Sequence, residues 1–190
     1  MNILVTGGAG VAASCLYQTF PNAFYSDVVE TESTSNLKNY FKCDLSNFDS
    51  VKKLTKNKDL IIHLGAESNP NSSWNKILKN NIISTKNLFD SAFQNNVQKI
   101  IFASSNRVYG GYELEHNRQL QLGKTEITEK THVFPINYYA ISKVFGENLA
   151  KWYSLTTDIK FYVLRIGALL SEKNDNPYAY ADLGVKNKKW

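Results

Sequence analysis

The stretch that decides the fold is 3-ILVTGGAGVAAS-14, a short apolar run that leads into glycines and then into small residues. The run predicts a buried β-strand, and the spacing Gly7-x-x-Gly10-x-x-Ala13 predicts a tight turn that opens a helix. Glycine permits that turn and lets a phosphate approach the backbone N–H groups, while a small third residue lets helix and strand pack closely. Taken alone, such a triplet is also found in turns that bind no ligand.

The rest of the chain alternates between short apolar runs and segments with helical periodicity. The runs predict strands at 2–6, 23–27, 40–44, 59–64, 99–105 and 160–167. Several are apolar almost throughout, which is typical of parallel strands covered on both faces. Helical patterns lie at 11–20, after an expected N-cap at Ser46, and at 73–95 and 135–155. The alternation predicts one α/β domain over 1–190, a Rossmann-type doubly wound parallel sheet flanked by helices, with 111–134 as a long loop near the active site.

The composition is that of an ordinary folded protein, with 43% hydrophobic and 21% charged residues. The formal charge of +5 comes from dispersed lysines without a nucleic-acid motif, so no nucleic-acid partner is expected. No apolar run approaches the roughly 18 residues of a membrane span, and Met1 begins no secretory pattern, so the cytoplasm and no membrane partner are expected. Cys15 and Cys43 are expected to be small buried thiols, and His116 and His132 lack metal-ligand spacing, so no metal is expected.

An acidic residue follows the glycine turn at the distance that a dinucleotide site requires. Asp27 ends the second predicted strand, about twenty residues after the glycines. A carboxylate there accepts hydrogen bonds from an adenosine ribose and repels a 2′-phosphate, which predicts NAD rather than NADP. Asp44 ends the third predicted strand, where it is either an adenine contact or a surface acid.

The stretch 137-NYYAISK-143 carries the expected chemistry. Tyr139 and Lys143 are four residues apart, which places them on one helix face. A lysine ammonium one turn away favours the phenolate, so the tyrosine can take a proton from a substrate hydroxyl. Ser104 and Ser105 end the strand 99–105, where α/β sheets bind their ligands, and offer a hydroxyl for the substrate oxygen. By itself, a tyrosine and a lysine at this spacing are more often exposed surface residues of a helix. The glycine turn and the serines favour a catalytic role.

Together these segments resemble the extended short-chain dehydrogenase/reductase superfamily, in its NAD-dependent epimerase/dehydratase group. The resemblance covers nearly the whole chain and rests on TGGAGVAAS, HLGAES, NNIISTKNL, SSNRVYG, YAISK and LRIG. It implies that Ser105, Tyr139 and Lys143 form the catalytic triad. It also implies a cofactor site for NAD that comprises Gly7, Gly10, Val11, Ala12, Asp27, Asp44, Leu45, Leu64, Gly65, Ala66, Asn81, Lys143 and Ile166.

Within the superfamily, WNKILKNNI, FASSN and SKVFGENLA look most like uronate dehydrogenases and related sugar 1-dehydrogenases. Those enzymes oxidise a sugar at its anomeric carbon to a lactone. The resemblance implies a small-molecule sugar substrate that contacts Ser68 and Asn106, with Ser104 as a further substrate-binding residue. Two alternatives stay open: Ser68 as part of an unspecific polar loop, and Asn106 as the cap of a strand end.

The chain departs from the family in two places. Members carry an arginine for the substrate carboxylate shortly after the last strand, where this chain has only Lys173 as a cation. Members also continue well past Trp190, so the chain is expected to be truncated, with 168–190 a remnant of the substrate-binding region and little or no C-terminal substrate subdomain. Two other functions therefore stay open, a nucleotide-sugar epimerase or dehydratase that recycles NAD, and an inactive NAD-binding protein.

Several other side chains are expected to pack or pair within the fold, namely His63, Trp74, Tyr138 and Arg165. The helices 73–95 and 135–155 resemble those that pair across dimers of the superfamily. A homodimer through these helices is therefore expected, with Phe93 and Tyr153 facing the partner.

Overall fold

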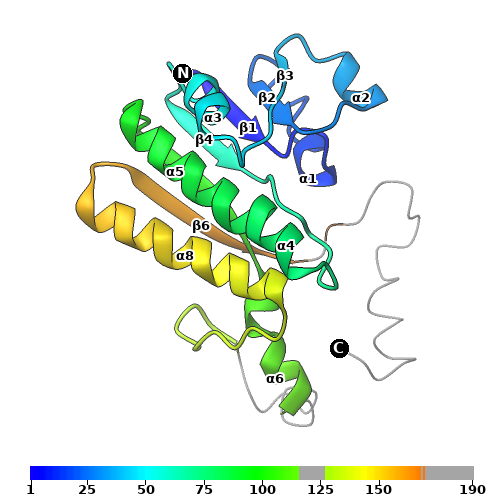
Figure 1. The fold of residues 1–190 in the computed structure, drawn as a ribbon, viewed down its shortest axis with the longest axis vertical. Coiled ribbons are helices and arrows are strands. Elements are labelled where there is room, and N and C mark those ends of the chain that lie inside the picture. The colour runs from blue at the N-terminus through cyan, green and yellow to red at the C-terminus, as the bar shows by residue number, and fades with distance from the viewer. Residues whose placement is uncertain (116–126, 168, 170–190) are drawn as a thin grey trace.

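A single sheet is the central element of the computed structural model, which describes residues 1–115, 127–167 and 169. Six parallel strands hydrogen-bond in the order β3-β2-β1-β4-β5-β6. Chain order runs outward from β1 on one side and from β4 on the other, so the predicted doubly wound parallel sheet is confirmed (Figure 1). The strands are Ile3–Thr6 (β1), Phe24–Asp27 (β2), Tyr40–Lys42 (β3), Leu60–His63 (β4), Lys99–Ser105 (β5) and Lys160–Ile166 (β6).

Helices connect the strands and cover the sheet. Segments α4, η1 and α5 follow one another without a break and lie beside α8 (Figure 1). No helix in the described part of the chain is long and apolar enough to cross a membrane. The helical segments are Val11–Ser14 (α1), Glu32–Ser35 (α2), Phe48–Leu54 (α3), Trp74–Ile77 (α4), the π-helix Leu78–Ile83 (η1), Ser84–Gln94 (α5), the 3-10 helix Asn106–Tyr109 (η2), Gly110–Glu115 (α6) and Tyr138–Thr156 (α8).

Two apolar cores lie on the two faces of the sheet. Side chains alternate along a strand, so Leu4 and Ile61 enter the larger core while Val5 and Ile62 enter the smaller one. The larger core is packed with rings from α5, β5 and α8, and Phe89 of α5 is fully buried at its centre. Because β1 and β4 are covered on both faces, their sequences are apolar at nearly every position.

The edge strand β6 is less covered than its apolar sequence predicts. Arg165 faces α8 and Phe161 packs on the rings of the larger core. On the opposite face, Tyr162 and Leu164 are 52% and 50% exposed. Burial of strands on both faces therefore does not extend to β6 within the described part of the chain.

Several boundaries differ from the predicted ones, and the differences at α1, α3 and the predicted loop are the following. Helix α1 ends at Ser14, and turns rather than helix follow it. The cap of α3 is Asn47, whose Oδ1 accepts from the backbone N–H of Ser50 at 3.0 Å, because the Ser46 hydroxyl instead donates to Asp44 at 2.7 Å. The predicted loop 111–134 begins within helix α6, and its part 116–126 lies outside the described residues.

Some side chains also occupy other environments than predicted. Cys15 is exposed, because α1 ends before it, whereas Cys43 is buried as expected. Trp74 is 43% exposed and meets the ring of Tyr138 edge-on, so it is not part of the core. Tyr153 is only 5% exposed and packs within the larger core, so it does not face a partner. The expected homodimer stays a prediction.

Helix α8 approaches β5 through a glycine. A Cβ atom on Gly146 would lie 2.3 Å from Cζ of Phe102, a distance that real Cβ contacts do not show. The ring of Phe102 is 1% exposed and is held between His63 and Phe89, so it has no free space to move into. The close contact between α8 and β5 therefore requires a glycine at this position.

We expect Gly146→Ala to lower the stability, although alanine favours a helix over glycine by about 1 kcal/mol. Overpacking a buried contact costs about 1–3 kcal/mol, and each kcal/mol changes the Tm by about 2–4 °C in a domain of this size. The measurement is thermal unfolding followed by circular dichroism. Ser154→Ala, on the exposed face of the same helix, is the control and should leave the Tm nearly unchanged. A Gly146→Ala protein with a raised Tm would contradict the packing argument.

Candidate functional site

A cavity of about 730 Å³ opens at the carboxyl ends of the strands. Parallel α/β sheets bind ligands at this edge, where the strand order reverses. Nearly all of the predicted site residues line it, and they come from every strand end. The lining set contains Gly7, Gly10, Val11, Ala12, Asp27, Asp44, Leu45, Leu64, Gly65, Ala66, Ser68, Ser104, Ser105, Asn106, Tyr139, Lys143 and Ile166.

The glycine turn after β1 touches the turn after β4. Gly7 has a φ of +73°, and a Cβ there would lie 2.6 Å from the backbone nitrogen of Gly65. The carbonyl of Gly7 accepts from the N–H of Gly10 at 3.0 Å, which closes the turn before α1. In the described part of the chain, the N–H groups of Val11 and Ala12 have no acceptor. These two donors, at the wall of a cavity that glycine keeps open, fit the phosphates of a dinucleotide.

Two carboxylates stand at the end of the cavity formed by β2 and β3. Asp27 accepts the N–H of Ala9 at 3.1 Å and that of Val28 at 2.7 Å, one on each carboxylate oxygen. These bonds fix the carboxylate beside the glycine turn. Asp44 pairs with Lys79 at 2.9 Å, and a hydrogen bond from this ammonium lowers the pKa of the Asp44 carboxyl.

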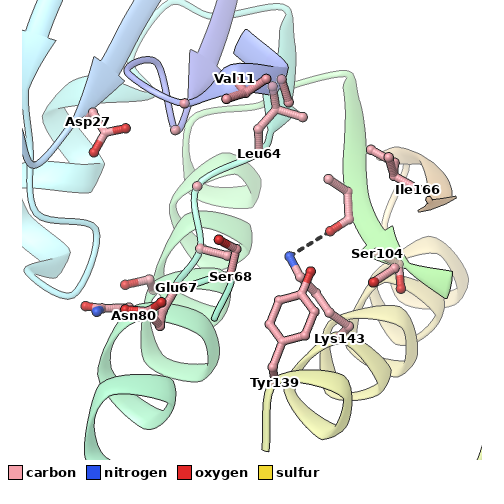
Figure 2. A pocket seen from close by; sticks show the side chains of 18 of the residues that line it. Val11, Asp27, Leu64, Glu67, Ser68, Asn80, Ser104, Tyr139, Lys143 and Ile166 are labelled. Carbon is pink, nitrogen blue, oxygen red and sulfur yellow. Dashed lines mark hydrogen bonds between the residues drawn. The ribbon is translucent and has the colours of Figure 1, made fainter. Parts of the chain in front are cut away.

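Tyr139 and Lys143 reach the opposite end of the cavity from one face of α8 (Figure 2). The side chain of Asn137 starts this helix, since its Oδ1 accepts the N–H of Ala140 at 2.8 Å. Lys143 Nζ lies 5.6 Å from the centroid of the Tyr139 ring and donates to the Ala103 carbonyl at 2.8 Å. Burial lowers the pKa of the Lys143 ammonium to about 8.

The two serines at the end of β5 have different partners. Ser105 caps η2, and its Oγ accepts the N–H of Arg107 at 3.2 Å. Ser104 donates to Glu147 Oε1 at 2.5 Å. Asn106 follows them in η2, and its side-chain oxygen lies 3.5 Å from Ser105 Oγ. The Ser105 hydroxyl therefore has the freer oxygen for a ligand, whereas the Ser104 proton is already donated within the protein.

Asn81 is the one predicted site residue outside the cavity lining. Its side-chain amide pairs with the backbone N–H and carbonyl of Glu67, at 2.8 and 3.0 Å, and also donates to Ser142 Oγ at 2.9 Å. Ser142 in turn donates to the Tyr139 carbonyl at 2.6 Å. Asn81 thus ties the turn after β4 to the first turn of α8, and its neighbour Asn80 lines the cavity in its place.

Sequence reasoning missed five polar residues of the cavity wall, namely Ser26, Glu67, Asn80, Ser84 and Arg107. Glu67 and Ser68 lie on the same turn, across the cavity from Tyr139 (Figure 2). Glu67 lies just after a predicted strand, and this position could have indicated that it lines the cavity. The sequence offers no such signal for Asn80 and Ser84. They lie in and beside the π-helix η1, and the sequence pattern does not indicate where a π-helix changes the direction of the side chains.

His63 is buried behind the cavity, as the sequence predicted. Its ring nitrogens lie 2.7 Å from Thr6 Oγ1 and 3.1 Å from Thr85 Oγ1. Burial, followed by the nearby charge of Lys143, lowers the pKa of His63 to about 3. The ring is therefore neutral at physiological pH and has a packing role. No cluster of possible metal ligands is found among the described residues.

Comparison with known proteins gives a match to one family and to several enzymes of sugar metabolism. The family model described as the NAD dependent epimerase/dehydratase family matches residues 3–182. An NAD-dependent glucose-6-phosphate dehydrogenase from Haloferax volcanii is 27% identical over 192 residues, which cover 93% of this chain and 71% of that protein.

Two solved structures extend this comparison. Glucuronic acid dehydrogenase from Chromohalobacter salexigens is 34% identical with a TM-score of 0.77, covering 88% of this chain and 60% of its own. UDP-N-acetylglucosamine 4-epimerase from Methanobrevibacter ruminantium is 25% identical with a TM-score of 0.74, covering 99% of this chain and 63% of its own. The chain thus spans less than two thirds of the length of these two solved chains.

The buried ammonium makes a pH-dependent contribution to stability. Lysine in an unfolded chain has a pKa of about 10.4, whereas the pKa of Lys143 in the fold is about 8. Below pH 8 both states are protonated and burial opposes folding in full. Between about pH 8 and 10 the unfolded state binds more protons, so the contribution of Lys143 to stability rises with pH.

We therefore expect the Tm of the wild type minus that of Lys143→Met to increase by several degrees from pH 7 to pH 9.5, because methionine carries no charge. Thermal unfolding of both proteins in one buffer series measures this difference. Lys86→Met, which removes an exposed lysine on α5, is the matched control for loss of a lysine. A difference between wild type and Lys143→Met that stays constant with pH would show that Lys143 is not buried as a cation.

Proposed function

The chain belongs to the NAD-dependent epimerase/dehydratase family, and on that premise we propose that it is an NAD-dependent oxidoreductase acting on a sugar or sugar acid. The observation that carries the proposal is the meeting of Ser105, Tyr139 and Lys143 at one end of a single cavity. The glycine turn and Asp27 line the other end of the same cavity. A reacting sugar and a dinucleotide can therefore occupy it together.

Tyr139 is the proton acceptor in the proposed oxidation. NAD, when bound, supplies the hydride acceptor. The Tyr139 hydroxyl points into the cavity beside Lys143, whose positive charge stabilises a phenolate electrostatically (Figure 2). A phenolate in that place takes the proton from the substrate hydroxyl as the carbon beside it is oxidised.

Ser105 orients the substrate oxygen in this proposal. Its hydroxyl accepts one backbone hydrogen bond from Arg107 at 3.2 Å. Its proton makes only a long bond of 3.5 Å to Asn106 Oδ1, and in this proposal it turns to donate to the reacting oxygen. Lys143 has a second donor task, because an ammonium has three protons and the Ala103 carbonyl takes only one. Its remaining donors face the cavity, where they can hold a ribose hydroxyl of the cofactor.

The substrate side of the cavity is polar, with the charged Glu67 and Arg107 among several uncharged side chains. Ser68, Asn80 and Asn106 line it, and hydroxyl and amide groups of this kind bind sugar hydroxyls. The names of the Haloferax and Chromohalobacter relatives, a sugar phosphate dehydrogenase and a sugar acid dehydrogenase, support a sugar in this place. Lys173 is the only cation where family members carry an arginine for the substrate carboxylate, and it lies outside the described residues.

A second candidate function is a nucleotide-sugar epimerase or dehydratase that recycles its NAD. The observation that favours it is the epimerase structure, which matches 99% of this chain, a larger share than the 88% that the glucuronic acid dehydrogenase structure matches. The two functions use the same reacting side chains and differ in whether reduced cofactor leaves. Purified protein that retains NAD and releases no NADH with any free sugar would support the second function.

Tyr139→Phe should reduce turnover by a factor of about 100 or more, because it removes the proton acceptor. The assay is NADH absorbance with a panel of aldoses, aldose phosphates and uronates, together with calorimetric binding of NAD. Affinity for NAD should stay within about twofold of the wild type. The neighbouring Tyr138→Phe is the matched control, because its exposed ring meets that of Trp74 and is not among the residues lining the cavity, so loss of its hydroxyl should leave turnover unchanged. Full turnover by Tyr139→Phe would refute the assignment.

Asp27→Asn should reduce the preference for NAD over NADP by a factor of about ten or more, since it removes the charge that repels a 2′-phosphate. The dissociation constants of both cofactors, measured by calorimetry, give the ratio directly. Asp44→Asn is the matched control at the next strand end, because the ammonium of Lys79 already neutralises that carboxylate. It should change both affinities by a similar factor. A ratio that stays the same in Asp27→Asn would show that Asp27 does not face the 2′ position.

A further inference from the structure

Four paired side chains lie behind the serine that ends β5, and we name Ser104, Tyr109, Glu147 and Arg165 together the Glu147 cluster. Arg165 holds Glu147 in a two-pronged contact, with Nε donating to Oε1 at 2.9 Å and Nη2 donating to Oε2 at 2.6 Å. Ser104 donates to the same Oε1 at 2.5 Å. The remaining arm of the guanidinium, Nη1, donates to the Tyr109 hydroxyl.

The cluster joins the four elements that meet around Ser105. Ser104 directly precedes Ser105 in β5, and Tyr109 ends η2, the short helix that Ser105 caps. Glu147 lies one turn after Lys143 on α8, and Arg165 is in β6. The chain on both sides of Ser105 is therefore tied, through one carboxylate and one guanidinium, to the helix that carries the proton acceptor.

The cluster also extends to the last part of the predicted active-site loop 111–134. The Tyr109 hydroxyl donates to the carbonyl of Thr128 at 3.0 Å, while it accepts from Arg165. The guanidinium also lies 4.9 Å from the centroid of the Tyr109 ring. One phenol thus connects the charged pair to residues 127–134, which border η2.

Net stability is a weak explanation for the cluster. The side chains of Glu147 and Arg165 are only 13% and 26% exposed, so both charges have lost much of their hydration. For such a pair, the loss of hydration largely offsets the attraction, whereas the planar two-pronged contact fixes the orientation of both groups. The carboxylate of Glu147 raises the pKa of the Arg165 guanidinium, so this group stays charged throughout the physiological pH range.

We propose that Glu147 is a positioning residue of the reaction, which fixes the position of Ser105 relative to Tyr139. It acts through Ser104 on one side of Ser105, and through Arg165 and Tyr109 on the other. This role deepens the proposed function and rests on it, because it assumes that Ser105 orients the substrate oxygen. The consequence is kinetic. A shift of the serine by about 1 Å costs a factor of about 100 in turnover without weakening a cofactor held at the other end of the cavity.

The test starts from Glu147→Gln, which keeps one acceptor oxygen and removes the charge. We expect kcat to fall by a factor of about 10 to 100 while the dissociation constant of NAD stays within about twofold. Arg165→Met should give a similar loss, and the double variant should be no worse than the more impaired single one, because both act through one unit. Lys86→Met, which breaks the exposed ion pair with Asp90 on α5, is the control and should leave kcat unchanged.

A second measurement separates this proposal from the proposed function. The N–H of Arg107 donates to Ser105 Oγ, so its hydrogen exchange reports the position of that hydroxyl without any turnover. Exchange at Arg107 should accelerate in Glu147→Gln at a temperature at which the variant is folded. If the wild type turns over no sugar but this exchange accelerates, the proposed function fails, while the placement of the Ser105 hydroxyl by the cluster stands.

Ser104→Ala provides the same test if the Glu147→Gln protein does not fold, because it removes only a single hydroxyl. It should lower kcat in the same direction and accelerate exchange at Arg107. If the folded Glu147→Gln and Ser104→Ala proteins both keep the wild-type kcat and the wild-type exchange at Arg107, the cluster has only a structural role and the proposal is overturned. A lowered Tm with unchanged kcat and unchanged exchange at Arg107 would overturn it as well.

Discussion

The ammonium of Lys143 lies out of water against the carboxyl end of β5, and the geometry of the site depends on this placement. The side chain is 5% exposed, and its charge is compensated by the Ala103 carbonyl and by the faces of the Phe102 and Tyr139 rings. A buried cation is tolerated only where such partners are already in place. They are in place because Gly146, less than one turn further along α8, allows helix and strand to touch. The packing of one helix on one strand therefore decides where the positive charge lies.

The cavity depends on a second close approach, at the middle of the sheet. The left-handed turn at Gly7 lies against Gly65, so the turns after β1 and β4 meet where the strand order reverses. One half of the sheet then presents Asp27 and the glycine turn, and the other half presents Ser105 and the face of α8. In the proposed function, cofactor binding and proton transfer would use different halves of one sheet, with both kinds of side chain in a single cavity.

Much of this was predictable from the sequence, where local chemistry and spacing determine the outcome. Apolar runs predict the strands because the sheet interior accepts little else, and the four-residue spacing of Tyr139 and Lys143 places both on one face of a regular helix. Sequence reasoning did not predict features that depend on contacts between segments far apart in the chain. The π-helix shifts the register around Asn81, so its amide is directed to the backbone of Glu67 rather than to the cavity. Equally, no local pattern shows that one face of β6 stays half exposed within the described residues.

The two sides of the cavity differ in how firmly they are held. Around the reacting groups, the polar side chains are buried and paired, as the contacts of Lys143 and Asn81 show. Ser68 and Asn106, on the substrate side, are exposed and lie on a loop and a short helix. A reaction tolerates little displacement, whereas a binding surface on exposed segments can change without disturbing the sheet. If the proposed function holds, such a division would let residues outside the proton transfer select the substrate, and the names of the relatives do specify different sugars.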